Sequence, residues 1–486
     1  MSSFHLTTAI NYTNGKPHLG HAYEVITADF FARWNRLLGK NVFFQTGTDE
    51  HGQKIAETAL NKEISCIDLC NEYSEEFVSL NRRLNISSDF FIRTTMLNHK
   101  ICAQEVWRKA KADIYLGEYE GWYSTREERF YTFLEAQMCD YKDGDVPLKK
   151  IKEESYFFRL SKYQERIIQH IKENPEFIFP KEKQQEILER LKEPLQDLSI
   201  SRKTCTWGIP VPDDPSHVMY VWFDALTNYF SMDSTFQKWP ANIHIIGKDI
   251  IWFHAVIWSG MLMSLKLPLP KTIVCHGFIN DDQGRKMSKS YGNSVDPILM
   301  MNKYGSDPFR YFLLREGSFG SDLSFSEANL KERYQKELAN NLGNLVQRTF
   351  RLAELYSKSK VPEESASNIF DITELISTID KFSNEYQINK AVDIIFETCT
   401  RINQWLTKEE PWKTKNDKHQ RTVVRTLLEA LVLLSFLLDP IIPLTSQEIL
   451  TRLNLDSLSI HIIKEQQWKI LREGSVVNSG PVLFPL

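Results

Sequence analysis

Phe4-His5-Leu6-Thr7-Thr8-Ala9-Ile10 is a short run of threonine and apolar residues, a composition that predicts a β-strand. Residues 11–17 follow with Asn, Gly and Pro, which are typical of a turn. Apolar residues then recur at every fourth position over residues 22–38, as on one face of a helix that Gly39 can end. Residues 41–46 predict another strand. This order of elements is typical of a parallel α/β sheet, whose ligands bind beyond the carboxyl ends of the strands.

The rest of the chain divides into an interruption of this sheet, its continuation and a helical region. Residues 112–205 are rich in charges and aromatics and show little α/β alternation, so we interpret them as an insertion. The sheet pattern resumes at residues 219–222, 243–247 and 272–277. From residue 326 onward, long amphipathic stretches separated by Pro and Ser predict a helix bundle. The expected domain ranges are 1–111, 112–205, 206–325 and 326–486.

Composition excludes several classes of protein. A net charge of −4 over 486 residues means that any nucleic-acid binding must come from local basic surface. The seven cysteines are scattered and odd in number, which favours reduced thiols in a cytoplasmic protein over a disulfide framework. The most apolar run, residues 430–438, is far shorter than the about 20 residues that span a bilayer. We expect a buried helix there, no membrane association and no leader peptide.

The tetrapeptide His18-Leu19-Gly20-His21 marks the start of the first predicted helix. A helix N-terminus offers unpaired N–H groups and the positive end of its dipole, which together favour phosphate. Two imidazoles on that turn can donate to phosphate oxygens, and Gly20 leaves space for a base or ribose. The simple alternative is a pair of surface or core histidines, and it would be preferred for an isolated His-x-x-His.

A second motif, Lys286-Met287-Ser288-Lys289-Ser290, follows the last predicted strand in a loop opened by residues 281–285. Two ammonium groups and two hydroxyls on a loop suit a polyphosphate whose charge grows as pyrophosphate leaves. The alternative is a solvated basic loop. No Walker-type loop or Gly-x-Gly-x-x-Gly fingerprint competes as a nucleotide site in this sequence.

The two motifs resemble the HIGH and KMSKS signatures of class I aminoacyl-tRNA synthetases. Within that class, the chain is similar over nearly its whole length to methionyl-tRNA synthetases, most clearly at residues 7–15, 46–52, 220–229 and 246–254. The resemblance implies an α/β Rossmann-type catalytic domain with an inserted connective domain, followed by an α-helical anticodon-binding bundle. It also implies that ATP activates L-methionine to methionyl-adenylate, and that methionine then passes to the 3′-terminal adenosine of tRNA(Met).

The resemblance assigns roles to individual residues of this sequence. The catalytic signatures match at His18, His21, Lys286 and Lys289. The ATP contacts match at Gly20, Gly247, Asp249, Ile279, Lys286, Ser288 and Lys289. The methionine pocket matches at Ala9, Ile10, Tyr12, Asp49, Val221, Trp222, Ala225, Tyr229, Ile250 and His254.

Three of these implied roles have a clear chemical basis. Asp49 would pair with the α-ammonium group of the substrate, which requires a fixed negative charge. The aromatic side chains would pack against the thioether, because sulfur packs well against ring edges. Tyr12 and His254 could also offer polar hydrogens near the sulfur. Taken singly, each aromatic residue could equally be ordinary core packing.

The sequence departs from its relatives where many of them hold zinc. They place cysteine pairs just after a Trp-Tyr, whereas here Trp122-Tyr123 is followed by residues 124–127, which are Ser-Thr-Arg-Glu. Cys139 is the nearest thiol, and one thiol cannot build a tetrahedral zinc site. We therefore expect no structural zinc, only Mg²⁺ accompanying ATP, and a connective domain with its own core around residues 156–160. The insertion is also too short for the editing domain of the leucine, isoleucine and valine enzymes.

Residues 331–360 carry seven Lys/Arg against three Glu, which could track phosphates but could equally be a solvated helix face. By resemblance, the anticodon contacts match at Asn344, Arg348 and Trp412. The first two can hydrogen-bond base edges and the tryptophan can stack on an unpaired base. Because the chain ends about where the family core ends, we expect a monomer.

Three other functions are consistent with parts of the pattern. One is a class I synthetase for another amino acid, such as cysteine or leucine. A second is a non-catalytic tRNA-binding paralogue, which would not need His18, His21, Lys286 and Lys289. A third is a small-molecule nucleotidylyltransferase with a His-x-Gly-His site, although such enzymes lack the helical bundle.

Overall fold

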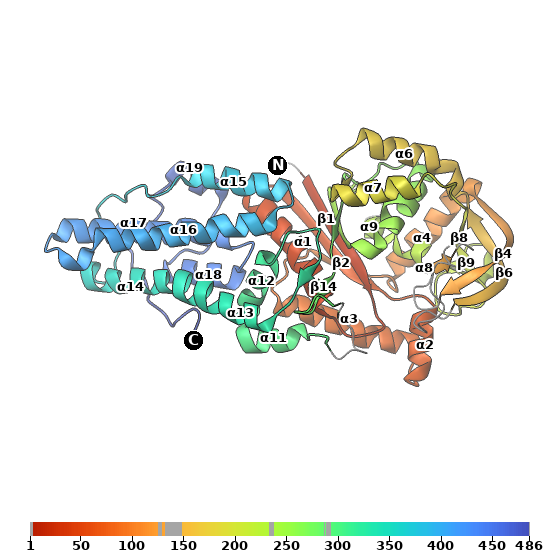
Figure 1. Cartoon of the computed structure of the whole chain (residues 1–486), viewed down its shortest axis with the longest axis horizontal. Coiled ribbons are helices and arrows are strands. Elements are labelled where there is room, and N and C mark those ends of the chain that lie inside the picture. The colour runs from red at the N-terminus through yellow and green to blue at the C-terminus, as the bar shows by residue number, and fades with distance from the viewer. Residues whose placement is uncertain are drawn as a thin grey trace.

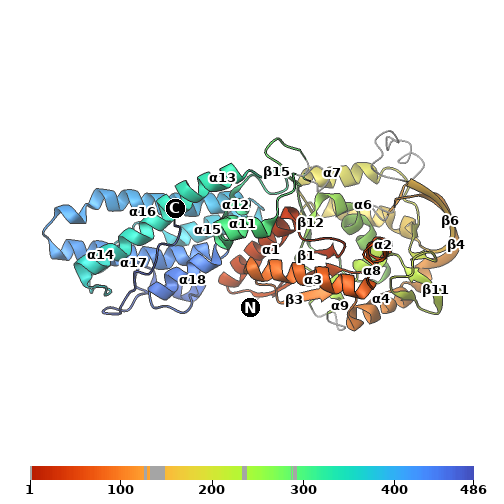
Figure 2. The same ribbon diagram turned by 90° about the horizontal axis from the view of Figure 1, so that it is seen from below.

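The computed structural model describes residues 3–124, 129–131, 148–232, 238–285, 287 and 293–485. Two lobes lie end to end along the long axis of the molecule (Figure 1). One lobe contains the sheets and the other consists of helices. The view from below shows the same division (Figure 2).

A parallel sheet of six strands, counted over the described residues, forms the centre of the mixed lobe as the sequence predicts. Its strand order is β3-β2-β1-β12-β13-β7, and each neighbouring pair is parallel. The strands are β1 (Ser3–Tyr12), β2 (Asn41–Asp49), β3 (Phe90–Arg93), β7 (Ile178–Phe179), β12 (Ile243–Gly247) and β13 (Thr272–His276). The chain leaves β1 on one side towards β2 and returns on the other as β12. Ligand crevices form at the carboxyl end of such a reversal.

Helix α1 (Leu19–Leu37) follows β1 and packs on the sheet with its large apolar side chains buried. Phe30, Phe31 and Trp34 are each 1% exposed. Gly39 follows the helix with a φ of +80°, a left-handed conformation that glycine adopts without strain, and this confirms the predicted stop. Burial of this face fixes the start of α1 against the carboxyl ends of the strands.

The other helices of this lobe surround the sheet. They are α2 (Gln53–Asn61), α3 (Cys66–Arg83), α4 (Leu97–Lys109), α6 (Gln164–Glu173), α7 (Lys181–Arg190), α9 (Asn228–Ser231), α10 (Ser259–Ser264), α11 (Pro297–Tyr304) and α12 (Ser306–Arg315). A π-helical segment, Phe253–Trp258, precedes α10. The short strands β14 (Ile279–Asn280) and β15 (Leu323–Ser324) pair beside the end of β13.

The range 112–205, expected as an insertion, shares its core with the rest of the lobe. Antiparallel strands β4 (Ile114–Ser124), β5 (Arg129–Tyr131), β6 (Leu148–Phe158) and β8 (Leu198–Ser199) form one sheet here. The expectation of a separate core around residues 156–160 is wrong, because Phe158 and Leu160 are buried in the cluster that contains Phe223 and Trp258. β7 lies in the same range but joins the edge of the parallel sheet.

The predicted strand at residues 219–222 is also wrong. β11 (Asp214–Met219) ends there and pairs antiparallel with β9 (Ser201–Arg202) and β10 (Pro210–Val211), outside the parallel sheet. Helix α8 (Val221–Ala225) begins two residues later. A run of four apolar residues cannot be assigned to strand or buried helix by periodicity alone. The consequence is that Trp222 and Ala225 project from one short helix.

The second lobe is a helix bundle, as predicted. It contains α13 (Glu327–Arg333), a π-helix (Tyr334–Gly343), α14 (Asn344–Ser357), α15 (Ile372–Asn384), α16 (Ile388–Glu409), α17 (Asp417–Leu438), α18 (Pro443–Arg452) and α19 (Ile460–Gln466). The apolar run 430–438 lies in α17, and its residues are at most 1% exposed, so the predicted buried helix is confirmed. Of the helices in the described ranges, none is long and apolar enough to cross a membrane.

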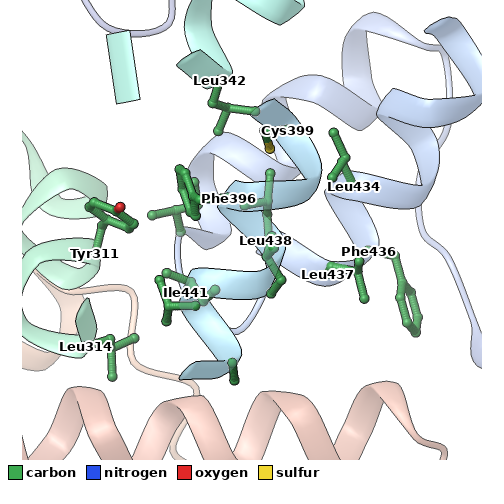
Figure 3. Packing of buried hydrophobic residues seen from close by; sticks show 14 of the residues in the cluster. Tyr311, Leu314, Leu342, Phe396, Cys399, Leu434, Phe436, Leu437, Leu438 and Ile441 are labelled. Atoms are coloured by element: carbon green, nitrogen blue, oxygen red, sulfur yellow. The ribbon is translucent and has the colours of Figure 1, made fainter. Parts of the chain in front are cut away.

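One apolar cluster continues from α1 and β1 into the bundle helices α14, α16 and α17. Figure 3 shows the contact between α12 and the bundle, where Tyr311 faces Phe396 with ring centroids 4.5 Å apart. The two lobes therefore share one apolar core.

Candidate active site

A cleft of about 600 Å³ opens at the carboxyl ends of β1, β2, β12 and β13, where the strand order reverses. It brings together most residues proposed from the sequence. Those lining it are Ala9, Ile10, Tyr12, His18, Gly20, His21, Asp49, Trp222, Ala225, Tyr229, Gly247, Asp249, Ile250, His254 and Ile279. Val221 is buried beside Trp222 in α8 and does not line the cleft. Lys286, Ser288 and Lys289 lie outside the described residues, whereas Met287 between them lines the cleft.

The two histidines of the first motif are held by the helix start itself. His18 caps α1: the Gly20 N–H donates to its Nδ1 over 3.1 Å, and the His18 N–H donates to Nδ1 of His21 over 3.1 Å. The rings stack with centroids 3.7 Å apart. Because each Nδ1 accepts a backbone hydrogen, the ring hydrogen of each residue must be on Nε2. The arrangement therefore supplies two imidazole donors at a helix N-terminus, which suits an anion.

The absence of a side chain at Gly20 leaves room for the His18 ring. A Cβ on Gly20 would lie 3.0 Å from Cε1 of His18. A side chain at this position would therefore crowd the ring that makes the capping bond. The sequence suggested open space for a nucleotide here, and the structure adds this second reason for glycine.

The other half of the cleft is lined by aromatic rings around one carboxylate. Asp49 ends β2, is 4% exposed and pairs in register with Tyr12 at the end of β1. Trp222 stacks on Phe253 with centroids 3.7 Å apart. An anionic group beside apolar, polarisable walls is suited to an amino acid with an apolar side chain.

His254 cannot offer a polar hydrogen in this arrangement, contrary to the expectation from the sequence. Its Nδ1 donates to the Ile250 carbonyl over 2.9 Å, and its Nε2 accepts from the Tyr229 hydroxyl over 2.6 Å. Burial lowers the pKa of His254 to about 4, so the ring is neutral at pH 7. With both nitrogens engaged, His254 instead fixes the orientation of Tyr229.

Several residues that line the cleft were not singled out from the sequence. Glu24 follows His21 by three residues, and helical spacing alone places both on one face of α1. His276 lies at the end of the strand predicted over residues 272–277 and Phe278 directly after it, so their position at its carboxyl end was available as a signal. Lys54 lies 5.5 Å from the Tyr12 ring, and no pattern in the sequence indicated this contact.

The three residues expected to read an anticodon lie in the helical lobe. Asn344 and Arg348 are one turn apart on α14. Trp412 lies in the 3₁₀ turn Pro411–Lys413 and is 46% exposed. The Arg348 guanidinium lies 5.7 Å from the Trp412 ring centroid, so the structure brings these two residues together.

The described residues contain no group of three or more His, Cys, Asp or Glu side chains that could hold a metal ion. The cysteines within these ranges are free thiols, while Cys139 lies outside them.

Comparisons with known proteins agree along the whole chain. A family model described as "tRNA synthetases class I (M)" matches residues 4–145 and 134–350, and one described as "Anticodon binding domain of methionyl tRNA ligase" matches residues 357–485. The methionine–tRNA ligase of Rhizobium meliloti is 44% identical over 100% of this chain and 97% of that protein. The methionine–tRNA ligase of Rickettsia felis is 39% identical over 100% of this chain and 98% of that protein.

Solved structures give the same result. Mycobacterium tuberculosis methionyl-tRNA synthetase in complex with methionyl-adenylate is 37% identical, with a TM-score of 0.90 and 100% of both chains covered. Its apo form gives a TM-score of 0.83 at 34% identity, covering 100% of this chain and 98% of that one. The sheet, its His-x-Gly-His turn and these matches define a class I aminoacyl-tRNA synthetase. Within that class, the chain belongs to the methionyl-tRNA synthetase family.

Proposed function

We propose that this chain joins L-methionine to tRNA(Met) in two steps at the cleft. A methionine carboxylate oxygen attacks the α-phosphorus of ATP, and the bond to the departing pyrophosphate breaks. A ribose hydroxyl of the terminal tRNA adenosine then attacks the carbonyl carbon of the adenylate, and AMP leaves. The observation that carries this proposal is the convergence of the His18–His21 turn, Asp49 and the aromatic wall around Trp222 in one cleft.

The nucleotide would occupy the side of the cleft formed by α1, β12 and β13. His18 and His21 would donate to phosphate oxygens, and Gly247 and Asp249 would contact the ribose. The Ile279 backbone would contact adenine, with Gly20 beside the nucleotide. From the second motif, Lys286, Ser288 and Lys289 would stabilise the pyrophosphate as it leaves.

Methionine would occupy the side formed by β1, β2 and α8, with its ammonium on Asp49. The walls that would surround its side chain are Ala9, Ile10, Tyr12, Val221, Trp222, Ala225, Tyr229, Ile250 and His254. Val221, which is buried next to Trp222 in α8, would act by holding that helix in place. Of the polar groups proposed near the sulfur, the Tyr12 hydroxyl remains the candidate donor, since His254 is engaged with Tyr229.

Amino-acid specificity decides between the proposed function and its nearest rival. ATP–pyrophosphate exchange should be measured with the purified protein and each standard amino acid in turn. Exchange is expected with methionine in clear preference to the others. Preference for cysteine, leucine or another amino acid would overturn the proposal, and absence of exchange with every amino acid would favour a non-catalytic paralogue.

Mg²⁺ would arrive with the nucleotide, because this ion is usually held by phosphates with one or two carboxylates. When bound, it would neutralise phosphate charge. We also propose that no structural zinc is present. Metal analysis of the purified protein is expected to find no stoichiometric zinc, and one tightly held equivalent would contradict the proposal.

Trp412, Arg348 and Asn344 would read the anticodon. Replacing Trp412 with alanine is expected to raise the KM for tRNA(Met) about 5- to 150-fold, because stacking on a base contributes about 1–3 kcal/mol. Methionine-dependent ATP–pyrophosphate exchange should be unchanged, since Trp412 lies in the other lobe. Leu355→Ala is the control: Leu355 is 55% exposed on the same helix as Arg348 and should alter neither measurement. An unchanged KM for tRNA in Trp412→Ala would exclude the stacking role.

The proposed form is a cytoplasmic monomer. Light scattering should give a mass close to 56.8 kDa at micromolar concentration. A mass near twice that value would contradict the monomer.

A further inference from the structure

Two buried side chains of the cleft, Glu24 and His276, have no part in the function proposed above. Glu24 lies on α1 one turn after His21, and His276 is the last residue of β13. They are 6% and 7% exposed, and both line the cleft. His276 Nε2 lies 3.1 Å from Glu24 Oε2, although the residues are 252 positions apart in the sequence. The contact therefore joins two walls of the cleft.

The hydrogen bonds of His276 require one more proton than a neutral histidine and an ionised carboxylate provide. Nδ1 lies 2.8 Å from the Gly277 carbonyl oxygen, which only accepts, so Nδ1 carries a hydrogen. A neutral ring would then have a lone pair on Nε2, facing the lone pairs of Glu24. The bond exists only if the ring is an imidazolium or the carboxyl is protonated.

The surroundings of the pair favour retention of that proton. Burial raises the pKa of Glu24. Burial alone would lower the pKa of His276, but the bond to Glu24, the charges of Glu24 and Asp249 and the Gly277 carbonyl together outweigh burial, and the pKa is raised. The Asp249 carboxylate also faces this region: a Cβ on Gly247 would lie 2.6 Å from Asp249 Oδ1 and 3.9 Å from His276 Cε1.

We propose that Glu24 and His276 share this extra proton. Together they form a clamp, with no net charge, between the two walls of the nucleotide half of the cleft. The inference rests on the proposed ATP site. Without the proton, Glu24 would add a second negative charge near Asp249, on the side where a polyphosphate must bind. With it, the pair has no net charge and keeps its hydrogen bond. Because the shared proton cancels the charge of Glu24, this buried carboxyl group can line a site that binds an anion.

The clamp is also placed to set the width of that site. On one wall it holds the turn of α1 that carries His21. His276, on the other wall, also packs edge-on against Tyr23 of α1, with centroids 5.5 Å apart, so a second contact joins the two walls. The next residue, Gly277, lies against the backbone of Ser321: a Cβ on Gly277 would lie 2.2 Å from the Ser321 carbonyl oxygen. Glu24 and His276 are thus positioning residues for the groups proposed to contact phosphate and adenine.

The proton can be observed directly. In protein labelled with ¹⁵N-histidine and ¹³C-glutamate, NMR at pH 7.5 should show either both His276 ring nitrogens protonated or a protonated Glu24 carboxyl. In Glu24→Gln, the amide can donate to Nε2, so Nε2 should show an unprotonated shift. An unprotonated Nε2 together with an ionised Glu24 in the unaltered protein would overturn the proposal.

Kinetics test the charge argument separately. His276→Ala leaves a buried carboxylate unpaired and is expected to raise the KM for ATP at least about tenfold, with the KM for methionine little changed. Glu24→Gln is expected to raise the KM for ATP only about threefold. The double variant Glu24→Gln/His276→Ala should bind ATP better than His276→Ala alone, because position 24 then carries no buried charge.

The double variant separates the clamp from ordinary packing. If the pair only filled space, removing both groups would be at least as harmful as removing one, and that result would overturn the proposal. Should His276→Ala fail to fold, the NMR measurement on the unaltered protein still decides. Methionine-dependent exchange by the unaltered protein is the separate test of the proposed function, so the two failures are distinguishable.

Discussion

Replacing Arg310 with methionine is expected to lower the free energy of unfolding by about 3–5 kcal/mol, the range for breaking a buried ion pair. Arg310 lies on α12 at the junction of the two lobes and is 0% exposed. Its guanidinium lies 2.8 Å from the Asp29 carboxylate of α1. It also donates to three backbone carbonyl oxygens over 2.9–3.0 Å, those of Leu84, Pro440 and Ile441.

The size of the effect follows from what the substitution leaves behind. Three buried carbonyl oxygens would lose their donor, and each such loss has a desolvation cost. Asp29 would keep Arg33, at 2.8 Å, as its remaining cation. Burial alone would raise the pKa of Asp29, but Arg310, Arg33 and two hydrogen bonds from Ser87 together outweigh burial and the pKa is lowered, so the carboxylate stays charged. Methionine preserves most of the volume, which separates the polar loss from cavity formation.

Urea denaturation followed by circular dichroism measures this change as a shift of the transition midpoint. Arg351→Met is the matched control. The Arg351 side chain is 64% exposed and pairs with Glu354 on the surface of α14, so its loss should change stability by less than about 1 kcal/mol. If Arg310→Met and Arg351→Met unfold at the same urea concentration, Arg310 does not hold the lobes together.

Local periodicity was sufficient to predict the elements that build the cleft. The four-residue spacing over residues 22–38 becomes α1, and the apolar runs at 243–247 and 272–277 become β12 and β13. Because parallel strands end at one edge, their order along the chain already placed His18 and Asp49 on the same side. The prediction of a strand at 219–222 was wrong, because four consecutive apolar residues show no periodicity that distinguishes a strand from a helix.

Long-range pairing was beyond the reach of sequence patterns. The sequence around Phe158 predicted the core of a separate domain. Its ring centroid instead lies 6.4 Å from that of Phe223, which is outside the predicted insertion. His254 looked like a donor to a ligand, yet Ile250 and Tyr229 occupy both of its ring nitrogens. The Phe158–Phe223 contact and the His254–Tyr229 hydrogen bond join segments that are distant in the sequence, so they depend on the tertiary fold.

Asp49→Asn is expected to reduce kcat/KM for methionine in ATP–pyrophosphate exchange about 100- to 1000-fold. The proposed partner of Asp49 is the α-ammonium group of methionine, and Asp49 is only 4% exposed. Truncating one member of a buried charge pair costs about 2–5 kcal/mol, partly because the other charge is left without a partner. Asparagine keeps the shape and one acceptor oxygen but not the negative charge. The KM for ATP should change little.

The α-hydroxy analogue of methionine is the matched control, because it replaces the ammonium by an uncharged hydroxyl. The unaltered protein should use this analogue poorly, since the Asp49 carboxylate would then be buried beside a neutral group. Asp49→Asn should therefore lose the preference for the amine, with kcat/KM for the analogue changing by no more than about threefold. An equal loss for methionine and for the analogue would show that Asp49 supports the shape of the pocket and does not pair with the ammonium group.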